Sequence, residues 1–343
     1  MSNNYPSINR QVILKARPKG MPTQEDFGLI EAPIPKPGPG QVLVRNLLLS
    51  LDPYMRGIMD EGESYQSPVP LGEVMRGHTV SQVVTSRAEG FVDGDIVFCA
   101  GQWQDYSVQN PQGAPPPRKI DVVAAPAAAW LGPMGLPGWT AYVGLFDLSA
   151  PRPGETLVVS AASGAVGSLV GQLAKSQGLR VVGIAGGPSK CAYAVKELRF
   201  DACVDYKAPD FAKALAGACP SGIDIDFENA GGPVLEAIWP LLNPGARVVV
   251  CGLIAQYNAT TAVPGPDLTW LLKRRITMRG FIISDHRERL PKAIGDMLDW
   301  YRNGKLTFRE DVVEGLENAP EVFIGMLQGR NFGKLLVRLN EPQ

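Results

Sequence analysis

The sequence predicts a two-part α/β protein, in which a β-rich domain is joined to a doubly wound parallel sheet. Short β-like runs separated by Gly, Pro and Asp turns fill the first 128 or so residues. Beyond Ala129, six β-branched runs alternate with helical segments of about ten residues. A glycine-bearing turn joins the first of these runs to its helix. We therefore expect one domain over 1–128 and 308–343 and a second over 129–307.

The first domain is expected to form a barrel or sandwich of short strands. Its clearest strand candidates are Gln41–Leu51, His78–Ser86 and Asp95–Gly101. The segment "FVDGDIVFC" is typical of a tight turn that leads into a buried strand.

The second domain begins with a loop and a helix in "AWLGPMGLPGWTAYVGLFDL". Its six expected strands lie in "TLVVSAA", "RVVGIAG", "ACVDYK", "GIDIDFENA", "ARVVVCGLI" and "ITMRGFII". A long amphipathic helix is expected over Arg287–Asn303. The tail predicts a helix end and a final strand that returns to the first domain.

The composition is that of an ordinary globular protein. The chain has 343 residues, 45% hydrophobic and 20% charged, with a formal net charge of −1. This charge gives no reason to expect nucleic acid or an anionic membrane as a partner. No apolar run approaches the roughly 20 residues of a membrane span. The polar start lacks a signal-peptide pattern, so we expect a cytoplasmic protein.

The turn after the first parallel strand follows the pattern Ala162-x-Gly164-x-x-Gly167. In a strand–turn–helix context this pattern indicates a dinucleotide site. Gly164 allows the backbone to approach the phosphates, Gly167 allows the helix to pack closely on the strand, and the pyrophosphate lies at the helix N-terminus. Ala162 stands where the usual fingerprint has glycine.

The end of the second strand favours NADP(H) over NAD(H). An NAD site usually has an acidic residue there for the ribose 2′-hydroxyl, but this chain has Ala185, Gly186 and Gly187. The positive charge of the Lys190 ammonium can interact with a 2′-phosphate, and Tyr206 can hydrogen-bond the same group. A solvated lysine at a helix start is the alternative interpretation of Lys190.

Small and polar residues follow the fourth and fifth strands, at the sheet edge where ligands of open α/β sheets bind. Asn229 and Cys251 are thus candidates for lining the nicotinamide ribose. Tyr257 lies just past the fifth strand and Tyr54 lies in the β domain. A tyrosine hydroxyl there can stabilise the enolate formed by hydride attack on an enone or can deliver a proton, although packing alone would also explain a loop tyrosine.

No catalytic zinc site is expected. Zinc would need three Cys, His or carboxylate ligands, and the chain has two histidines, His78 and His286, for which structural or surface roles are expected. A four-cysteine lobe is also missing. The five cysteines are scattered without a C-x-x-C pair, so we expect free thiols.

Several motifs together resemble the zinc-independent branch of the medium-chain dehydrogenase/reductases. They are "LSLDPYMRG", "AASGAVG", "AGGPSK", "FENAGG", "QYN" and "NFGK", and they span nearly the whole chain in order. The branch includes leukotriene B4 12-hydroxydehydrogenase/prostaglandin reductases, alkenal double-bond reductases and curcumin reductases. The resemblance implies a GroES-like β domain, a Rossmann domain, a homodimer, and NADPH-dependent reduction of α,β-unsaturated aldehydes and ketones.

The resemblance also implies roles for individual residues. Tyr257 matches the tyrosine assigned to the substrate carbonyl, and Tyr54 matches a substrate-pocket tyrosine. The implied cofactor contacts are Pro53, Met134, Thr140, Gly164, Ala165, Val166, Gly167, Lys190, Tyr206, Asn229, Cys251, Tyr257, Phe281, Ile283, Asn331 and Gly333. One departure is Gly187-Pro188, where many relatives have Ser and an acidic residue. That substitution removes a hydroxyl ligand of the 2′-phosphate and leaves the strength of the NADPH preference open.

Two alternative functions remain compatible with the same residues. One is an NADPH:quinone reductase of the same superfamily. The other is a protein that binds NADPH without turnover, since a nucleotide site does not require catalysis.

Overall fold

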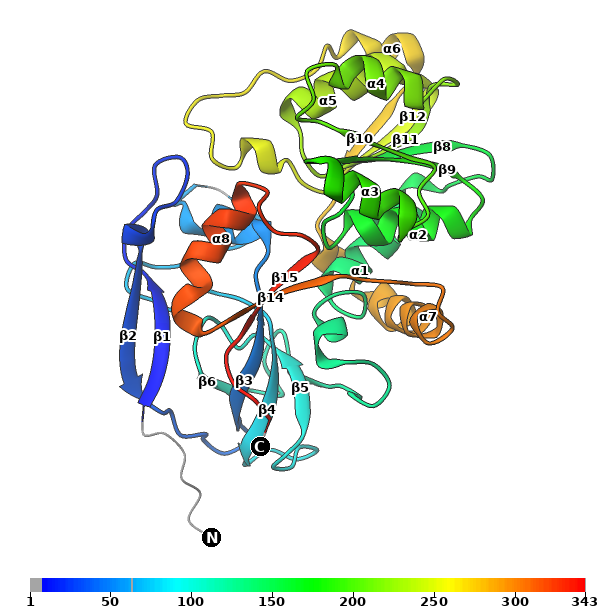
Figure 1. The fold of residues 1–343 in the computed structure, drawn as a ribbon. Helices are drawn as coiled ribbons and strands as arrows, with labels where there is room; N and C mark the ends of the chain where they lie inside the picture. Colours follow the sequence, from blue (N-terminus) through cyan, green and yellow to red (C-terminus); the bar gives the residue numbers. More distant parts are fainter. Residues whose placement is uncertain (1–7, 63, 343) are drawn as a thin grey trace. The chain divides into compact units, whose positions relative to one another are not determined.

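The computed structural model describes residues 8–62 and 64–342 of the chain (Figure 1). They form two compact units. The first comprises the described parts of Met1–Leu131, Glu310–Asn331 and Leu335–Gln343. The second comprises Gly132–Arg309 and Phe332–Lys334. Among the described residues, no helix is both long and apolar enough to cross a membrane.

The first unit is β-rich, as the sequence predicts. Within the described residues its main sheet has seven strands in the order β14-β15-β3-β4-β5-β7, and β6 pairs with β3. The strands are β3 Val42–Ser50, β4 Thr79–Ser86, β5 Ile96–Cys99, β6 Tyr106–Gln109, β7 Arg118–Lys119, β14 Glu310–Glu314 and β15 Lys334–Arg338. β15 runs antiparallel to β3, with Leu336 opposite Ser50. The tail thus adds strands to the sheet of the first unit.

A separate two-stranded sheet, β1 Ile8–Leu14 with β2 Phe27–Pro33, lies next to helix α8 Ala319–Leu327 in the first unit (Figure 1). An aromatic cluster fixes this arrangement. The Phe27 ring stacks on Trp103 with centroids 5.8 Å apart, and Phe323 of α8 meets Trp103 edge-on at 5.6 Å. Buried aromatic pairs of this kind stabilise beyond the area they bury.

The second unit contains a parallel sheet in the order β10-β9-β8-β11-β12-β13. Its strands are β8 Thr156–Val159, β9 Arg180–Ala185, β10 Ala202–Asp205, β11 Ile223–Glu228, β12 Leu242–Val250 and β13 Thr277–Gly280. Its helices are α1 Leu136–Tyr142, α2 Gly167–Ser176, α3 Pro188–Lys196, α4 Phe211–Ala218, α5 Gly232–Ile238, α6 Thr269–Arg274 and α7 Leu290–Arg302. The order reverses between β8 and β11, which is the point where ligands of this fold bind.

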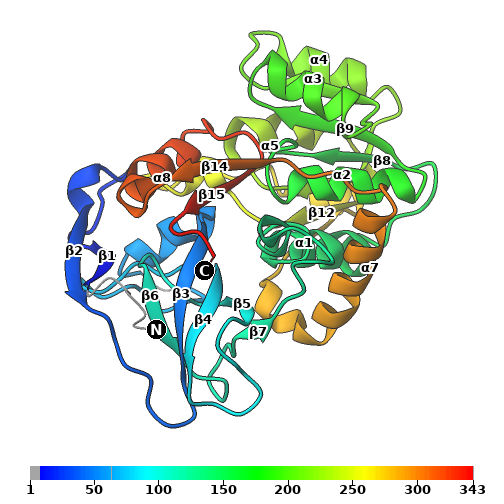
Figure 2. The same cartoon turned by 60° about the horizontal axis from the view of Figure 1, so that its bottom comes forward.

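Helices cover both faces of the parallel sheet. In Figure 1, α4, α5 and α6 lie above the sheet and α2 and α3 lie below it, and Figure 2 shows α1 and α7 side by side on the same side as α2. The doubly wound architecture predicted from the alternating runs is confirmed. The predicted helix over Arg287–Asn303 is shorter, because Pro291 is in the first turn of α7 and a 3₁₀ segment, Ile283–Arg289, precedes it.

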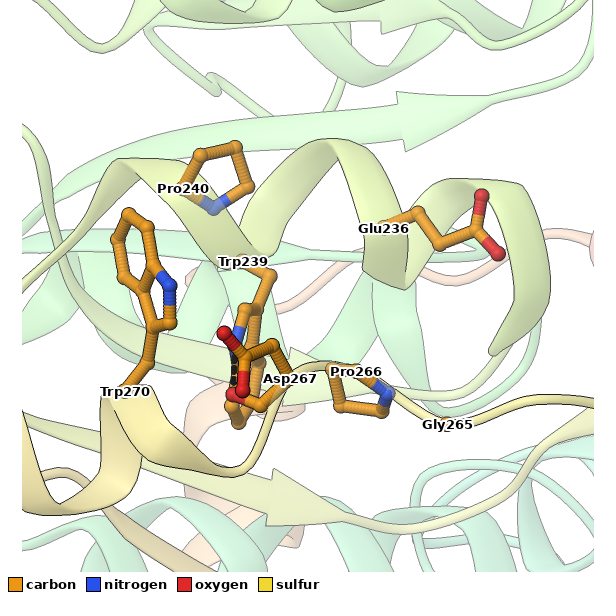
Figure 3. Close-up of a pocket in the computed structure, with 7 residues that line it drawn as sticks. All are labelled: Glu236, Trp239, Pro240, Gly265, Pro266, Asp267 and Trp270. Atoms are coloured by element: carbon orange, nitrogen blue, oxygen red, sulfur yellow. Dashed lines mark hydrogen bonds between the residues drawn. The ribbon is translucent and has the colours of Figure 1, made fainter.

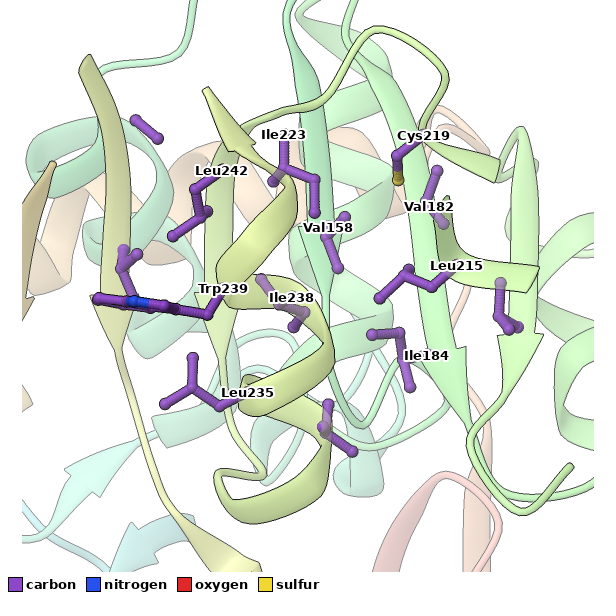
Figure 4. Packing of buried hydrophobic residues seen from close by; sticks show 14 of the residues in the cluster. Val158, Val182, Ile184, Leu215, Cys219, Ile223, Leu235, Ile238, Trp239 and Leu242 are labelled. Carbon is purple, nitrogen blue, oxygen red and sulfur yellow. The ribbon is translucent and has the colours of Figure 1, made fainter. Parts of the chain in front are cut away.

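One hydrophobic core fixes the upper helices onto the sheet (Figure 4). It contains strand residues such as Val158, Val182 and Ile184 together with helix residues such as Leu215 and Ile238, all almost fully buried. Burial of such side chains contributes about 1.5–3 kcal/mol each. The carboxyl ends of the strands, where the candidate site lies, are thereby held rigidly.

Candidate active site

The turn between β8 and α2 is tight because two of its glycines face the same carbonyl oxygen. A β-carbon on Gly167 would lie 2.5 Å from the Ala161 oxygen, and one on Gly164 would lie 3.1 Å from it. The Gly164 N–H donates to that oxygen at 2.8 Å. The Ser168 and Leu169 N–H groups donate to the Gly164 and Val166 carbonyls at 3.1 Å and 3.0 Å, so an anion at this helix N-terminus would meet the backbone of the preceding residues, 165–167. The turn therefore fits a pyrophosphate, with Ala165 and Val166 leading into the helix.

Ala162 occupies the first fingerprint position without distorting the turn. Its side chain is fully buried, and its N–H donates to the Ile184 carbonyl of β9 at 2.9 Å. A β-carbon on Gly183 would lie 2.8 Å from the Ala162 methyl carbon. The space for that methyl group is therefore provided by a glycine on the neighbouring strand.

The carboxyl end of β9 forms a small corner with the turn after β10. A β-carbon on Gly186 would lie 2.9 Å from the Tyr206 ring and 3.2 Å from its hydroxyl. Lys190 lies half-buried on α3, and the Lys207 ammonium lies 5.9 Å from the Tyr206 ring centroid. The structure thus brings the predicted Tyr206 against the glycine segment. Lys207 also lies in this corner. It was not among the predicted site residues, although it follows Tyr206 directly in "VDYK".

An acidic residue, Asp205, does lie in this corner, but its carboxylate accepts hydrogen bonds from backbone amides. The Asp205 carboxylate accepts the Gly187 N–H at 2.8 Å and the Lys207 N–H at 3.0 Å through one oxygen. These two hydrogen bonds hold the pKa of Asp205 below its usual value. Gly187 has φ of +96°, which favours glycine. Asp205 therefore fixes the backbone of this corner at Gly187 and Lys207.

A buried hydrogen-bond network holds Asn229 at the end of β11. The Ser160 hydroxyl donates to Glu228 Oε1 at 2.6 Å and accepts the Asn229 N–H at 2.7 Å. The Asn229 side-chain amide donates to the Ser160 carbonyl at 2.9 Å. Glu228 Oε1 also accepts the N–H groups of Ala230 and Gly231. The predicted Asn229 is thus fixed by Ser160 and Glu228, whose contribution no sequence pattern revealed.

Asp226, two residues before Glu228, is a fully buried carboxyl on β11. Among the described residues neither of its oxygens has a hydrogen-bond partner. Burial, and secondarily the nearby Glu228 carboxylate, raise the pKa of Asp226 well above its usual value. Burial therefore favours the protonated form of Asp226 in the folded protein.

Tyr257 lies after the fifth strand, next to a 3₁₀ turn over Ile254–Gln256. A β-carbon on Gly252 would lie 2.9 Å from the Tyr257 hydroxyl. Burial raises the pKa of Tyr257, while a hydrogen bond from the Leu253 backbone partly opposes this. Burial and the Glu228 charge raise the pKa of the adjacent Cys251 thiol to about 12. Tyr257 is thus a protonated hydrogen-bond donor, and Cys251 is a neutral lining group.

Comparison with known proteins agrees with this arrangement. A family described as the N-terminal domain of oxidoreductases matches residues 10–116, and one described as zinc-binding dehydrogenase matches residues 165–299. The chain is 48% identical to the NADPH-dependent curcumin reductase of Escherichia coli over 96% of this chain and 97% of that protein. It is 39% identical to the NADP(+)-dependent 2-alkenal reductase of Nicotiana tabacum over 97% and 98% of the two chains. The chain belongs to the zinc-independent branch of the medium-chain dehydrogenase/reductases.

A solved structure of the same branch has the same fold. CurA of Vibrio vulnificus in complex with NADPH is 49% identical, with a TM-score of 0.93 over 97% of this chain and all of that one. The agreement covers both the β-rich unit and the parallel sheet. The expected fold class, a GroES-like domain with a Rossmann domain, is therefore confirmed.

The other predicted cofactor residues of this family member lie in both units. In the second unit, Met134 is buried before α1, Thr140 is half-buried on α1, and Phe281 and Ile283 follow β13. A β-carbon on Gly333, where φ is +99°, would lie 2.3 Å from the Arg309 carbonyl oxygen. Pro53, Tyr54 and Asn331 belong to the first unit.

Tyr54 lies on a 3₁₀ segment, Pro53–Met59, that directly follows β3. Arg56 anchors this segment by donating to the Gly20 carbonyl at 3.0 Å and by pairing with Asp60 at 2.7 Å. Burial, with a smaller effect of the Asp52 charge, raises the pKa of the Tyr54 phenol. Tyr54 is consequently a protonated group on a rigid segment of the first unit.

The described residues contain no group of three His, Cys, Asp or Glu side chains arranged to hold a metal ion. The His78 ring stacks on Phe98 with centroids 5.2 Å apart, and the His286 ring meets Phe281 edge-on. Both histidines thus make aromatic packing contacts, although one matching family description refers to zinc.

A shallow pocket of about 330 Å³ lies elsewhere in the second unit (Figure 3). Its lining residues are Glu236, Trp239, Pro240, Gly265, Pro266, Asp267 and Trp270. The Trp239 indole N–H donates to the Asp267 carbonyl at 3.1 Å across the pocket. None of the predicted site residues lines this pocket, so it is separate from the candidate site.

Proposed function

We propose that this protein reduces the carbon–carbon double bond of α,β-unsaturated aldehydes and ketones with NADPH, by hydride transfer to the β-carbon and without zinc. The observation that carries the proposal is that one Rossmann unit contains both the glycine-lined corner beside Lys190 and a protonated Tyr257. The names of the relatives, curcumin reductase and 2-alkenal reductase, support the same substrate class. A cytoplasmic location is also part of the proposal.

NADPH fits the residues of the second unit. The turn over 164–167 is tight, since β-carbons on Gly164 and Gly167 would both press on the Ala161 carbonyl oxygen. Without those side chains, the backbone of the turn can approach a pyrophosphate closely. Lys190 and Tyr206 would hold the 2′-phosphate, and Asn229 would hold the nicotinamide ribose. Bound NADPH supplies the hydride.

Tyr257 would stabilise the substrate oxygen. As the β-carbon is reduced, negative charge develops on the carbonyl oxygen, and a donor aimed at that oxygen lowers the barrier. Because the pKa of Tyr257 is raised, the phenol keeps its proton across the physiological range. Solvent or a bound hydroxyl group then supplies the proton for the α-carbon.

The test compares Tyr257→Phe with the wild-type enzyme on enals and enones graded in size, from small alkenals to long diarylheptanoids. Loss of one such donor typically costs about 10²–10³ in turnover, so we expect a large fall in kcat with little change in KM for NADPH. Tyr301→Phe on α7 is the matched control, and it should keep full activity. An unchanged kcat/KM in Tyr257→Phe would remove the role proposed for this residue.

The same assay separates the two alternatives. Steady turnover of quinones without turnover of enals would identify a quinone reductase. Tight NADPH binding without oxidation on any substrate would identify a non-catalytic binding protein. The quinone oxidoreductase of Pseudomonas syringae shares the fold at 22% identity, which is too distant to favour its activity here.

We also propose a homodimer formed at the β13 edge of the Rossmann sheet. All four residues of Thr277–Gly280 are exposed, and β13 is the last strand of this sheet in the described part of the chain, where it pairs with β12. On the preceding helix, α6, Leu272 is 84% exposed, which is unusual for a large apolar side chain. A second copy would cover both features. Light scattering should show a dimer, and Leu272→Asp should weaken it.

A further inference from the structure

Two cysteines lie on neighbouring elements beside the corner at the carboxyl end of β9, Cys191 on α3 and Cys203 on β10. Cys203 is on β10 opposite Gly183 of β9, and a β-carbon on Gly183 would lie 3.2 Å from the Cys203 sulfur. The absence of a side chain at Gly183 thus leaves room for this thiol. Cys191, on α3, has its sulfur 4.0 Å from the Ala185 carbonyl oxygen at the end of β9. Both cysteines are free, and no disulfide links them.

The two sulfurs have different chemical environments. The interaction between the two side chains lowers the pKa of Cys191 and raises the pKa of Cys203. Cys191 lies in the first turns of α3, where the helix dipole favours an anion. Both side chains are partly exposed, whereas Cys99 and Cys219 are buried. A reactive, accessible thiol beside a second thiol is the arrangement found in peroxide-sensitive proteins.

We propose that Cys191 and Cys203 form a peroxide-sensitive modification site in which Cys191 reacts first and Cys203 resolves it to a disulfide. The Cys191 thiolate attacks one peroxide oxygen, the O–O bond breaks, and water leaves after protonation. Cys191 then carries a sulfenic acid. The Cys203 thiol attacks that sulfur, the S–O bond breaks, and a second water leaves as the S–S bond forms. The two thiols lose two electrons in total, and the peroxide gains them.

Disulfide formation should affect the corner that holds the 2′-phosphate. A disulfide holds the two sulfurs about 2 Å apart, and we expect it to draw α3 toward β10. Lys190 precedes Cys191 on α3, and Gly187 is held by Asp205 directly before the helix. Because oxidation displaces Lys190, we expect it to weaken NADPH binding. This consequence rests on the proposed NADPH site, whereas the thiol chemistry does not.

The chemical part is tested by peptide mass mapping of the full-length protein. Wild-type protein treated with hydrogen peroxide should yield a Cys191–Cys203 disulfide peptide that dithiothreitol reverses. Cys203→Ser should instead accumulate a dimedone adduct at Cys191, and Cys191→Ser should yield neither product. Cys219→Ser is the matched control and should behave as wild type. Dimedone labelling of Cys203 in Cys191→Ser, or no disulfide in wild type, would overturn the assignment.

The functional part is tested by NADPH binding measured from its fluorescence, which needs no turnover. Loss of the charge-assisted contact between Lys190 and the 2′-phosphate should raise the Kd by about tenfold, with recovery in dithiothreitol. Cys191→Ser should show no change with peroxide. An unchanged Kd in the mapped disulfide form would refute this consequence alone. Absence of enone reduction in wild type would refute the proposed function and leave the mass-mapping result standing.

Discussion

The methyl group of Ala162 and the bare Cα of Gly183 are complementary, since a β-carbon on Gly183 would lie only 2.8 Å from that methyl carbon. The two residues lie on neighbouring segments of the sheet edge, where the Ala162 N–H donates to Ile184 of β9. The dinucleotide turn therefore keeps its shape with alanine in the first position because the neighbouring strand lacks a side chain. The shape of the dinucleotide turn therefore depends on Gly183 of β9 as well as on the residues of the turn itself.

We expect Gly183→Ala to destabilise the protein by about 1–3 kcal/mol, because a new methyl group would overpack Ala162 and the Phe200 ring. NADPH binding should weaken as well. Adding Ala162→Gly should recover part of the loss, with a coupling energy of about 0.5–3 kcal/mol in a double-mutant cycle. Urea unfolding measures both effects. Gly217→Ala on α4, where a β-carbon has nothing within 4 Å, serves as the control, and strict additivity would contradict the relationship.

We expect Gly252→Ala to lower kcat for enone reduction, because its methyl group would press on the Tyr257 hydroxyl at 2.9 Å. The predicted fall is about tenfold, since small misplacements of a catalytic group cost up to about 10² in rate. Steady-state kinetics and the melting temperature should be measured together. Gly295→Ala on α7, which has open space around its Cα, should keep full activity. A normal kcat in Gly252→Ala would show that Tyr257 tolerates displacement.

We expect Ser160→Ala to raise the KM for NADPH about fivefold, which corresponds to about 1 kcal/mol. The substitution leaves the Asn229 N–H without its acceptor and removes one donor from Glu228, so the loop over 229–231 loosens. A buried unsatisfied group also costs about 1–3 kcal/mol of stability. Ser149→Ala removes a similarly buried hydroxyl bonded to Leu145. It should lose stability without a change in KM, and equal KM effects in both variants would argue against a positioning role.

The sequence predicts those parts of the fold that depend on local pattern. The β8–turn–α2 unit was predictable because glycine spacing and β-branched runs act within a few residues. The hairpin of Ile8–Leu14 with Phe27–Pro33 was not among the predicted strands, since charged and polar residues interrupt its apolar pattern. A helix was predicted in the segment that contains Val143–Leu148, but the π-helical form of Val143–Ser149 was not. Its Gly144 lies where a β-carbon would meet the Phe227 ring at 2.5 Å, which is a tertiary contact.

The candidate site likewise contains some residues that the local sequence pattern predicts and some contacts that it does not. Tyr206 could be placed beside the glycines of β9 because neighbouring parallel strands end at one edge. The contact between Ser160 and Glu228 joins residues 68 positions apart. Glu228 belongs to the "FENAGG" motif, but that motif does not indicate Ser160 as its partner. The same holds for the compensation of Ala162 by Gly183. Such pairings depend on strand register, which a single sequence does not reveal.

We expect Lys190→Ala to weaken NADPH binding about tenfold and to leave NADH binding unchanged. The lost interaction is a charge-assisted contact with the 2′-phosphate, worth about 1.5–3 kcal/mol, which NADH does not make. The ratio of the two KM values measures the effect directly. Lys196→Ala, at the far end of the same helix, is the matched control. A parallel fall with both cofactors would assign Lys190 to helix stability instead.

We expect Asp226→Val to stabilise the protein, and to do so more strongly as the pH rises. Val158 and Val248 lie opposite Asp226 in the neighbouring strands, so a valine continues an apolar row. Removing a buried carboxyl without partners should contribute about 1–3 kcal/mol. Burial raises the pKa of Asp226 well above 3.8 in the folded state, whereas the unfolded carboxyl titrates near about 3.9.

The sign of the pH dependence follows from proton binding. Above the unfolded pKa, the unfolded chain has released this proton and the folded protein retains it, so the wild-type free energy of unfolding falls as pH rises. This single group contributes a slope of up to about 1.4 kcal/mol per pH unit until the folded pKa is reached. Urea unfolding from about pH 5 to about pH 8 should therefore show a widening gap between Asp226→Val and wild type. Asp224→Val, which removes a carboxylate that accepts the Thr156 N–H at 2.8 Å, should destabilise instead. A gap that stays constant with pH would mean that Asp226 is ionised in the folded protein.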